Sequence, residues 1–122
     1  MSAEQFLDHA MDLADISRAI IREEISRPRV VTVKTDETPV TPTDQKVERA
    51  LRDAIKKTYP QHGIVGEEYD DQHTDSDYVW VLDPIDGTMA FIAGLPTFST
   101  LIALTWRGSP ILGVMDLSLI HI

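Results

Sequence analysis

The chain has 122 residues, of which 43% are hydrophobic and 25% charged, a composition typical of one small globular domain. Its formal net charge of −9 argues against a nucleic-acid-binding surface, which would normally be basic. The absence of cysteine excludes disulfides, cysteine-ligated zinc and thiol nucleophiles. No apolar run is long enough to cross a bilayer, and the polar start lacks a signal core, so we expect a cytoplasmic protein without a membrane partner.

Residues 3–26 are expected to form a long amphipathic helix. Ser2 and Gln5 have the spacing of a capping box, and apolar residues then recur at helical intervals until Pro28 interrupts the pattern. The apolar face is interpreted as part of the protein's own core, with a partner helix as the open alternative. Three histidines have no metal-like spacing and are interpreted as surface residues: His9, His62 and His73.

A short strand and a polar loop are expected next. Residues 29–34 are mostly β-branched and predict a strand that Lys34 closes. Residues 35–42 are rich in threonine and proline and predict a loop. On residue types alone, the loop is a connector and Lys34 is a solvated charge.

A second helix is expected after Thr41, with Pro42 at its first position. Apolar residues follow at helical spacing and form one stripe. Asp44 falls in the first turn, where the helix dipole favours a carboxylate, and this alone explains its presence. Glu48 and Arg52 have the i,i+4 spacing of an intrahelical ion pair.

Two apolar strands then lead directly into carboxylates. Residues 64–66 deliver Glu67 and Glu68, and residues 79–82 run into Asp83. If these two strands end side by side, Glu67 and Asp83 come together. The acidic residues from position 70 to position 77 follow no strand and are interpreted as a solvated loop.

The turn after Asp83 combines several groups that bind cations or phosphate. Pro84 has no N–H and is expected to stop the strand ladder. Asp86 adds a second carboxylate, Gly87 permits close approach of the backbone, and Thr88 adds a hydroxyl. This mixture suits a hard cation together with a phosphate. An ordinary strand and turn is the open alternative, because Asp-Pro and Asp-Gly are also common turn pairs.

Two further strands complete the expected architecture. Residues 98–106 predict a strand, residues 107–110 a hairpin-type turn, and residues 111–116 the returning strand. Two helices followed by mainly hairpin-linked strands predict an α+β fold. Both helices are expected on one face of a mainly antiparallel sheet.

Three ordered motifs resemble those of the inositol monophosphatase-like metal-dependent phosphatases. They are residues 34–44, the triplet 66–68 (Gly-Glu-Glu), and residues 83–88 (Asp-Pro-Ile-Asp-Gly-Thr). The resemblance runs from the first helix to Asp116 and implies the N-terminal part of the layered αβαβα sugar-phosphatase fold. On this basis, residues 1–116 are expected to be the N-terminal metal-binding part. Residues 117–122 are expected to be a non-native tail, and the C-terminal α/β part, with its Trp-Asp motif, to be missing.

The resemblance implies a set of metal ligands. Glu67, Asp83 and the Ile85 carbonyl would hold one Mg²⁺, and Asp83 and Asp86 would hold a second. A third ion is also expected in this family, so two or three ions are implied. Paired ions of this kind stabilise both the attacking and the leaving oxygen of a phosphoryl group.

The resemblance also implies catalytic and phosphate-binding roles. Glu67 and Thr88 would orient and help to deprotonate the attacking water, and Asp83 would support catalysis by bridging the ions. The amides of Gly87 and Thr88 would hold the substrate phosphate. Three further residues are expected in the outer shell of the site: Lys34, Asp44 and Glu68.

The implied function is Mg²⁺-dependent hydrolysis of a small phosphate monoester by a protein that is a homodimer when intact. Residues 79–83, 90–96 and 100–104 are most similar to the histidinol-phosphatase branch, so L-histidinol phosphate and histidine biosynthesis are expected. Met89 and Ala90 depart from the patterns of the branches. The alternatives are inositol-1-phosphate, an adenosine bisphosphate, or an inactive truncated Mg²⁺-binding domain.

Overall fold

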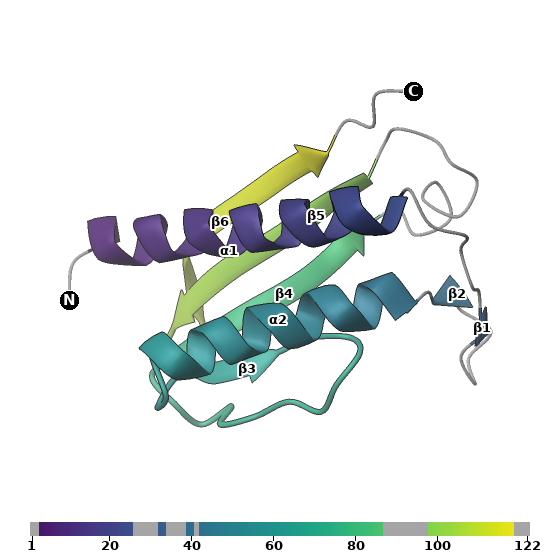
Figure 1. The fold of residues 1–122 in the computed structure, drawn as a ribbon. Coiled ribbons are helices and arrows are strands. Elements are labelled where there is room, and N and C mark those ends of the chain that lie inside the picture. Colours follow the sequence, from purple (N-terminus) through teal and green to yellow (C-terminus); the bar gives the residue numbers. More distant parts are fainter. Residues whose placement is uncertain (1–2, 26–31, 34–38, 41, 87–97, 119–122) are drawn as a thin grey trace.

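Two helices cover one face of a four-stranded sheet (Figure 1). The computed structural model describes residues 3–25, 32–33, 39–40, 42–86 and 98–118. Its elements, in chain order, are α1 (Ala3–Ile25), β1 (Thr32–Val33), β2 (Pro39–Val40), α2 (Pro42–Thr58), β3 (Gly63–Val65), β4 (Tyr78–Asp86), β5 (Phe98–Trp106) and β6 (Ser109–Ser118). The predicted α+β class is confirmed.

The sheet has the strand order β3-β4-β5-β6. β3 runs parallel to β4, whereas the β4–β5 and β5–β6 pairs are antiparallel, so the sheet is mixed but mainly antiparallel, as predicted. β1 and β2 form a separate two-residue antiparallel pair. The predicted strand over residues 29–34 is present at Thr32–Val33, and the rest of that range lies outside the described residues.

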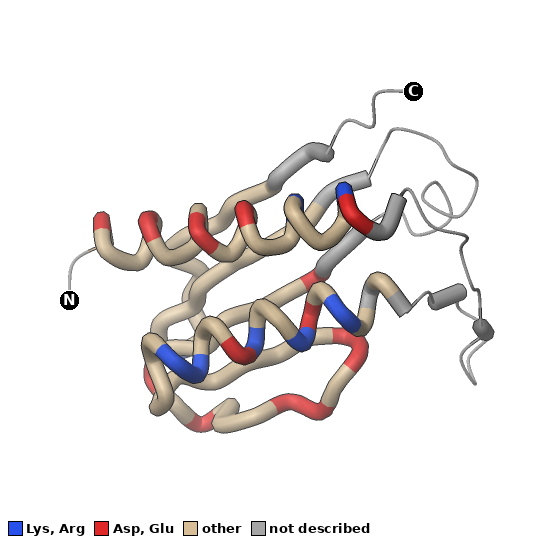
Figure 2. The backbone as a smooth tube through the Cα atoms, in the orientation of Figure 1, with Lys and Arg blue, Asp and Glu red and all other residues tan. Residues whose placement is uncertain are grey.

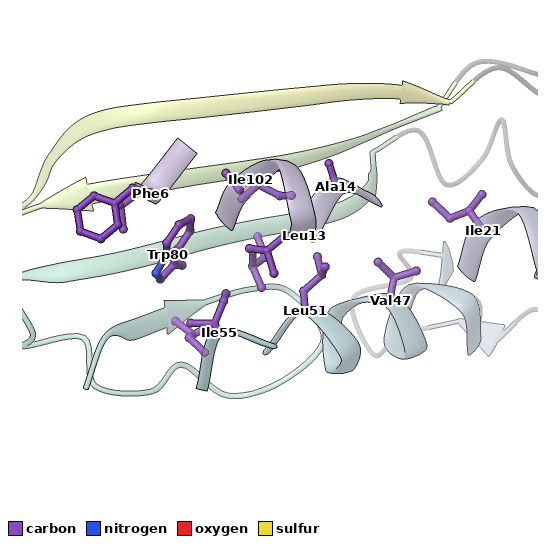
Figure 3. Packing of buried hydrophobic residues seen from close by; sticks show 13 residues of the cluster. Phe6, Leu13, Ala14, Ile21, Val47, Leu51, Ile55, Trp80 and Ile102 are labelled. Atoms are coloured by element: carbon purple, nitrogen blue, oxygen red, sulfur yellow. The ribbon is translucent and has the colours of Figure 1, made fainter. Parts of the chain in front are cut away.

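Both predicted helices are present, and they pack side by side on the sheet. α1 lies over β5 and β6, and α2 lies over β4 (Figure 1). One continuous core joins the helices to the sheet (Figure 3). Burying one large aliphatic side chain contributes about 1.5–3 kcal/mol. The fully buried members of the core are Phe6, Ala10, Leu13, Ala14, Ile21, Val47, Leu51, Ile55, Ile64, Trp80, Leu82, Ile102 and Leu104.

The β5–β6 connection is a tight hairpin. Arg107 and Gly108 both have positive φ angles, 49° and 83°. Two successive residues with positive φ are typical of a type I′ turn, whose twist matches that of the flanking strands. The predicted hairpin at residues 107–110 is therefore confirmed, although β6 begins within it, at Ser109.

Acidic residues recur along α1 and in the loop between β3 and β4 (Figure 2). In that loop, the carboxylates of Asp70, Asp71, Asp75 and Asp77 are all exposed, which confirms the predicted solvated loop. Among the described residues, no helix has the length and apolar character needed to cross a membrane.

The interpretation of His9 and His62 as surface residues is wrong. His62 is 9% exposed and stacks on Tyr59 with ring centroids 4.5 Å apart. The indole N–H of Trp80 donates to His62 Nδ1 at 3.0 Å, which places the His62 proton on Nε2. His9 is half-buried, with edge contacts to the rings of Tyr59 and Trp80. Both imidazoles therefore belong to an aromatic cluster, and of the three only His73 is exposed.

Candidate functional site

β3 pairs in parallel with β4, and one predicted carboxylate follows β3 while the other lies in β4. The register pairs Gly63 with Val79 and Val65 with Val81. β3 ends at Val65, so Glu67 follows the last register pair by two residues, and Asp83 follows it by two residues within β4. The two strands that lead to Glu67 and Asp83 therefore lie side by side, which meets the condition stated above for the strands themselves.

Asp83 lies on the open face of the sheet, the face turned away from α1 and α2. Its neighbour Leu82 is 1% exposed and belongs to the core, and successive residues of a strand point to opposite faces. Asp83 pairs with Leu101, which in turn pairs with Met115, so the three form one row across the sheet. The row lines a groove on the open face in which Asp83 is half-buried.

The expectation that Pro84 ends the strand is wrong. β4 continues to Asp86, which pairs with Ser99, after a register shift between Asp83 and Asp86. Three residue steps in β4 then oppose two steps in β5, from Leu101 to Ser99. This is a β-bulge, which accommodates a proline that has no N–H to donate to the ladder.

Two sets of hydrogen bonds hold the loop that follows β3: one between backbone groups where the loop begins and ends, and one to a buried side chain of α2. At the base, the Ile64 and Gln72 backbones exchange hydrogen bonds of 2.8 and 2.9 Å. Inside, the carboxylate of Glu48 from α2 accepts hydrogen bonds from the backbone N–H groups of Glu68 and Tyr69, both at 3.1 Å. The predicted Glu48–Arg52 pair is present at 3.0 Å, but it is buried beneath this loop. Helical spacing gave the pair but contained no signal for its burial.

The remaining candidate residues are placed only in part. Glu67 is exposed and Glu68 is half-buried. Asp44 is in the first turn of α2, as predicted. Three candidates lie outside the described residues: Lys34, Gly87 and Thr88.

A family comparison bears on the whole described region. The sequence profile of the inositol monophosphatase family matches residues 2–118. The chain belongs to the inositol monophosphatase family. The matched range contains both carboxylate strands, the bulge and the Glu48 loop, so the geometry described above is that of a family member.

Curated proteins with several different names are similar to this chain in sequence. The chain is 47% identical over 106 residues to bifunctional phosphatase IMPL2 of Arabidopsis thaliana, covering 85% of the chain and 31% of that protein. It is 36% identical over 111 residues to histidinol-phosphatase of Chlorobaculum parvum, covering 90% and 43%. It is 36% identical over 98 residues to inositol monophosphatase 1 of Bos taurus, covering 76% and 35%. Proteins named Nus factor SuhB also match. The chain spans less than half of each relative's length.

Solved structures from the same family share the fold. The Thermotoga maritima IMPase superposes with a TM-score of 0.82 at 33% identity, over 91% of this chain and 43% of that one. An inositol monophosphatase from Zymomonas mobilis superposes with a TM-score of 0.73 at 42% identity, over 94% and 44%. The helices and mixed sheet of this inositol monophosphatase family member are therefore the family's own arrangement.

The donor chemistry of the site suits a hard cation. The candidate ligands of this family member are carboxylate and carbonyl oxygens, which are the ligands that Mg²⁺ prefers. Within the described part of the chain, no group of three or more His, Asp or Glu residues is close enough to hold a metal ion. Among the described candidates, Glu67 follows β3 and Asp83 lies within β4, and a complete shell would require further ligands.

Proposed function

We propose that the protein hydrolyses a small phosphate monoester with Mg²⁺ bound where β3 and β4 deliver Glu67 and Asp83. The observation that supports the proposal is the parallel pairing of β3 with β4, because Glu67 follows Val65 by two residues and Asp83 follows its register partner Val81 by two residues. Membership of the inositol monophosphatase family supports the same reaction class.

Within this proposal the ligands come from one edge of the sheet. Glu67, Asp83 and the Ile85 carbonyl would hold one ion, and Asp83 and Asp86 a second, with a third ion as the upper limit. Bound Mg²⁺ would neutralise the phosphate charge and lower the pKa of water. Asp86 follows Asp83 by three residues in the same strand, and this closeness along the chain supports its assignment to the second ion.

The protein's own groups would orient the reactants. Glu67 and Thr88 would orient the attacking water and help to deprotonate it, with the Glu67 carboxylate as the base, while the Gly87 and Thr88 amides would hold the phosphate oxygens. Phosphoryl transfer depends mainly on positioning and charge neutralisation, so this division of labour needs no covalent intermediate. Lys34, Asp44 and Glu68 would act from the outer shell.

L-Histidinol phosphate is the first substrate of the proposal, within histidine biosynthesis. It is supported by the relative from Chlorobaculum parvum that is named histidinol-phosphatase. Inositol-1-phosphate is the second candidate, supported by the relative named inositol monophosphatase 1. Both substrates are phosphate monoesters, so they share the metal chemistry and differ in the group that leaves.

The proposal extends to the setting of the enzyme. Residues 1–116 would form its N-terminal metal-binding part, with a C-terminal α/β part completing the site. The active form would be a cytoplasmic homodimer. An inactive Mg²⁺-binding domain is the competing function, and turnover separates the two.

Asp83→Asn in the full-length protein tests the proposal. The amide keeps the shape of the side chain but loses the charge that binds cations. We expect kcat/KM for L-histidinol phosphate to fall by more than about a hundredfold, beyond the usual effect of an outer-shell change. Asp75→Asn, at an exposed carboxylate of the solvated loop, is the matched control and should match the wild type.

The measurement is phosphate release with Mg²⁺, run in parallel on L-histidinol phosphate and inositol-1-phosphate. Full activity of Asp83→Asn, or turnover that persists in excess chelator, would contradict the metal site. Faster turnover of inositol-1-phosphate than of L-histidinol phosphate would support the metal site but make inositol-1-phosphate the substrate.

A further inference from the structure

A completely buried carboxylate lies inside the loop that carries Glu67. Glu48 is 0% exposed, and its Oε1 accepts a hydrogen bond from the Glu68 N–H at 3.1 Å. Its Oε2 accepts one from the Tyr69 N–H at 3.1 Å and one from Arg52 Nε at 3.0 Å. A buried charge is tolerated only when it is paired and hydrogen-bonded, and Glu48 satisfies both conditions.

Arg52 binds the same loop through its other two nitrogens. Its two terminal nitrogens donate to the backbone carbonyls of Asp70 at 2.8 Å and Tyr69 at 3.0 Å. The guanidinium is 4% exposed, so these bonds are shielded from water. Together, the two side chains of α2 satisfy two N–H groups and two carbonyls of the loop backbone, which a solvated connector would leave to water.

Gly66 brings the loop directly onto the Glu48 carboxylate. A Cβ at position 66 would lie 2.6 Å from the carboxylate carbon of Glu48 and from one of its oxygens. Glu67 is therefore flanked on both sides by contacts to Glu48, through the Gly66 backbone before it and the Glu68 N–H after it. The Glu67 side chain is exposed, but the backbone on both sides of it contacts the buried Glu48 carboxylate.

We propose that Glu48, held by Arg52, is a positioning residue that fixes residues 66–70 and thereby sets Glu67 opposite Asp83. This inference rests on the proposed function, because it assigns Glu67 to the Mg²⁺ site. The rigid support has a clear use there, because metal ligands are oriented by the groups behind them. Glu48 itself does not touch the ion or the substrate.

Two variants and one control separate positioning from simple structural support. Glu48→Gln replaces one carboxylate oxygen with an NH₂ group, which faces the N–H donors of the loop or of Arg52. Arg52→Lys keeps a positive charge but loses the planar fork that binds the Tyr69 and Asp70 carbonyls. Asp53→Asn makes the same carboxylate-to-amide change at an exposed site of α2 and is the matched control.

The first readout is hydrogen exchange at the amides of Glu68 and Tyr69 in the full-length protein without metal. The second is the Kd of Mg²⁺ alone, by titration calorimetry at a temperature where near-ultraviolet circular dichroism shows a folded protein. We expect faster exchange at both amides and a Kd raised about ten- to hundredfold in Glu48→Gln. Asp53→Asn should match the wild type in both readouts.

Each outcome decides the matter. An unchanged Kd in Glu48→Gln, alongside Asp83→Asn that abolishes Mg²⁺ binding, would overturn the positioning role and leave the proposed function standing. A wild type that does not bind Mg²⁺ would overturn both. If Glu48→Gln does not fold, Arg52→Lys decides: a raised Kd supports positioning and a wild-type Kd overturns it.

Discussion

Burial lowers the pKa of two imidazoles, those of His9 in α1 and of His62. The pKa of His62 is lowered by burial and, to a smaller degree, by the nearby charge of His9. The pKa of His9 is also lowered by burial, and Asp12 opposes part of that effect. Both groups therefore bind fewer protons in the folded state than in the unfolded chain, where the ordinary value of 6.5 applies.

This difference predicts an acid-sensitive fold. As the pH falls below 6.5, His9 and His62 become protonated in the unfolded chain while they remain neutral in the folded state. The free energy of unfolding should therefore decrease. The loss continues until the pH reaches the lowered pKa values of the folded state. Urea unfolding between about pH 7.5 and about pH 5.5 measures the slope. His62→Gln, which retains an acceptor for Trp80, should flatten the slope, and an equal slope in this variant would contradict the assignment.

The residues that sequence reasoning misplaced are those whose partners are distant in the chain. Glu48 and Arg52 were recognised as a helical pair because their spacing is local. Their burial depends on backbone groups near Tyr69, which no helical periodicity encodes. His62 likewise depends on Trp80, 18 residues away.

At the scale of elements, β3 is a three-residue strand with partners on both sides. It pairs with β4 on one side and, through Ile64, with Gln72 on the other. This crowding leaves no room for a side chain at Gly63. A Cβ there would lie 2.3 Å from the His73 carbonyl oxygen and 2.9 Å from Val79 Cγ2.

Gly63→Ala should therefore destabilise the fold by about 1–3 kcal/mol, the usual cost of forcing an extra group into a packed site. The carbonyl is a backbone atom, so the clash is relieved only by moving the β3–loop bridge. Gly113→Ala in β6 is the matched control, because a Cβ there meets nothing within 4 Å. Urea unfolding of the 122-residue chain measures both variants, and equal stabilities would show that the bridge yields without cost.

Local sequence signals predicted most of the helices and strands, whereas the point at which β4 ends depends on its pairing partner. Proline and periodicity predict the start of α2 at Pro42, and the apolar runs that lead into Glu67 and Asp83 predict two strands, which the structure pairs in parallel. The missing N–H of Pro84 predicts that the strand stops there. A bulge forms instead because Ser99 of β5 is available to pair with Asp86, and the sequence around Pro84 does not contain that information.

At the scale of the whole molecule, the two faces of the sheet differ sharply. Both described helices cover one face, and no described helix covers the other (Figure 1). The open face carries apolar rows, with Val81 37% and Met115 62% exposed. Contiguous exposed apolar surface of this kind marks a contact surface or an aggregation hazard.

The 122-residue chain by itself should therefore associate as its concentration rises, because copies bury the open face against one another. Met115→Lys places a charge on that face, in the edge strand β6, and should shift the chain toward the monomer. Leu7→Lys is the matched control, since Leu7 is 43% exposed in α1, on the helix side of the sheet. Light scattering coupled to size-exclusion chromatography gives the mass at each concentration. A wild-type chain that stays monomeric, or a Leu7→Lys variant that dissociates as fully as Met115→Lys, would show that the open face does not drive association.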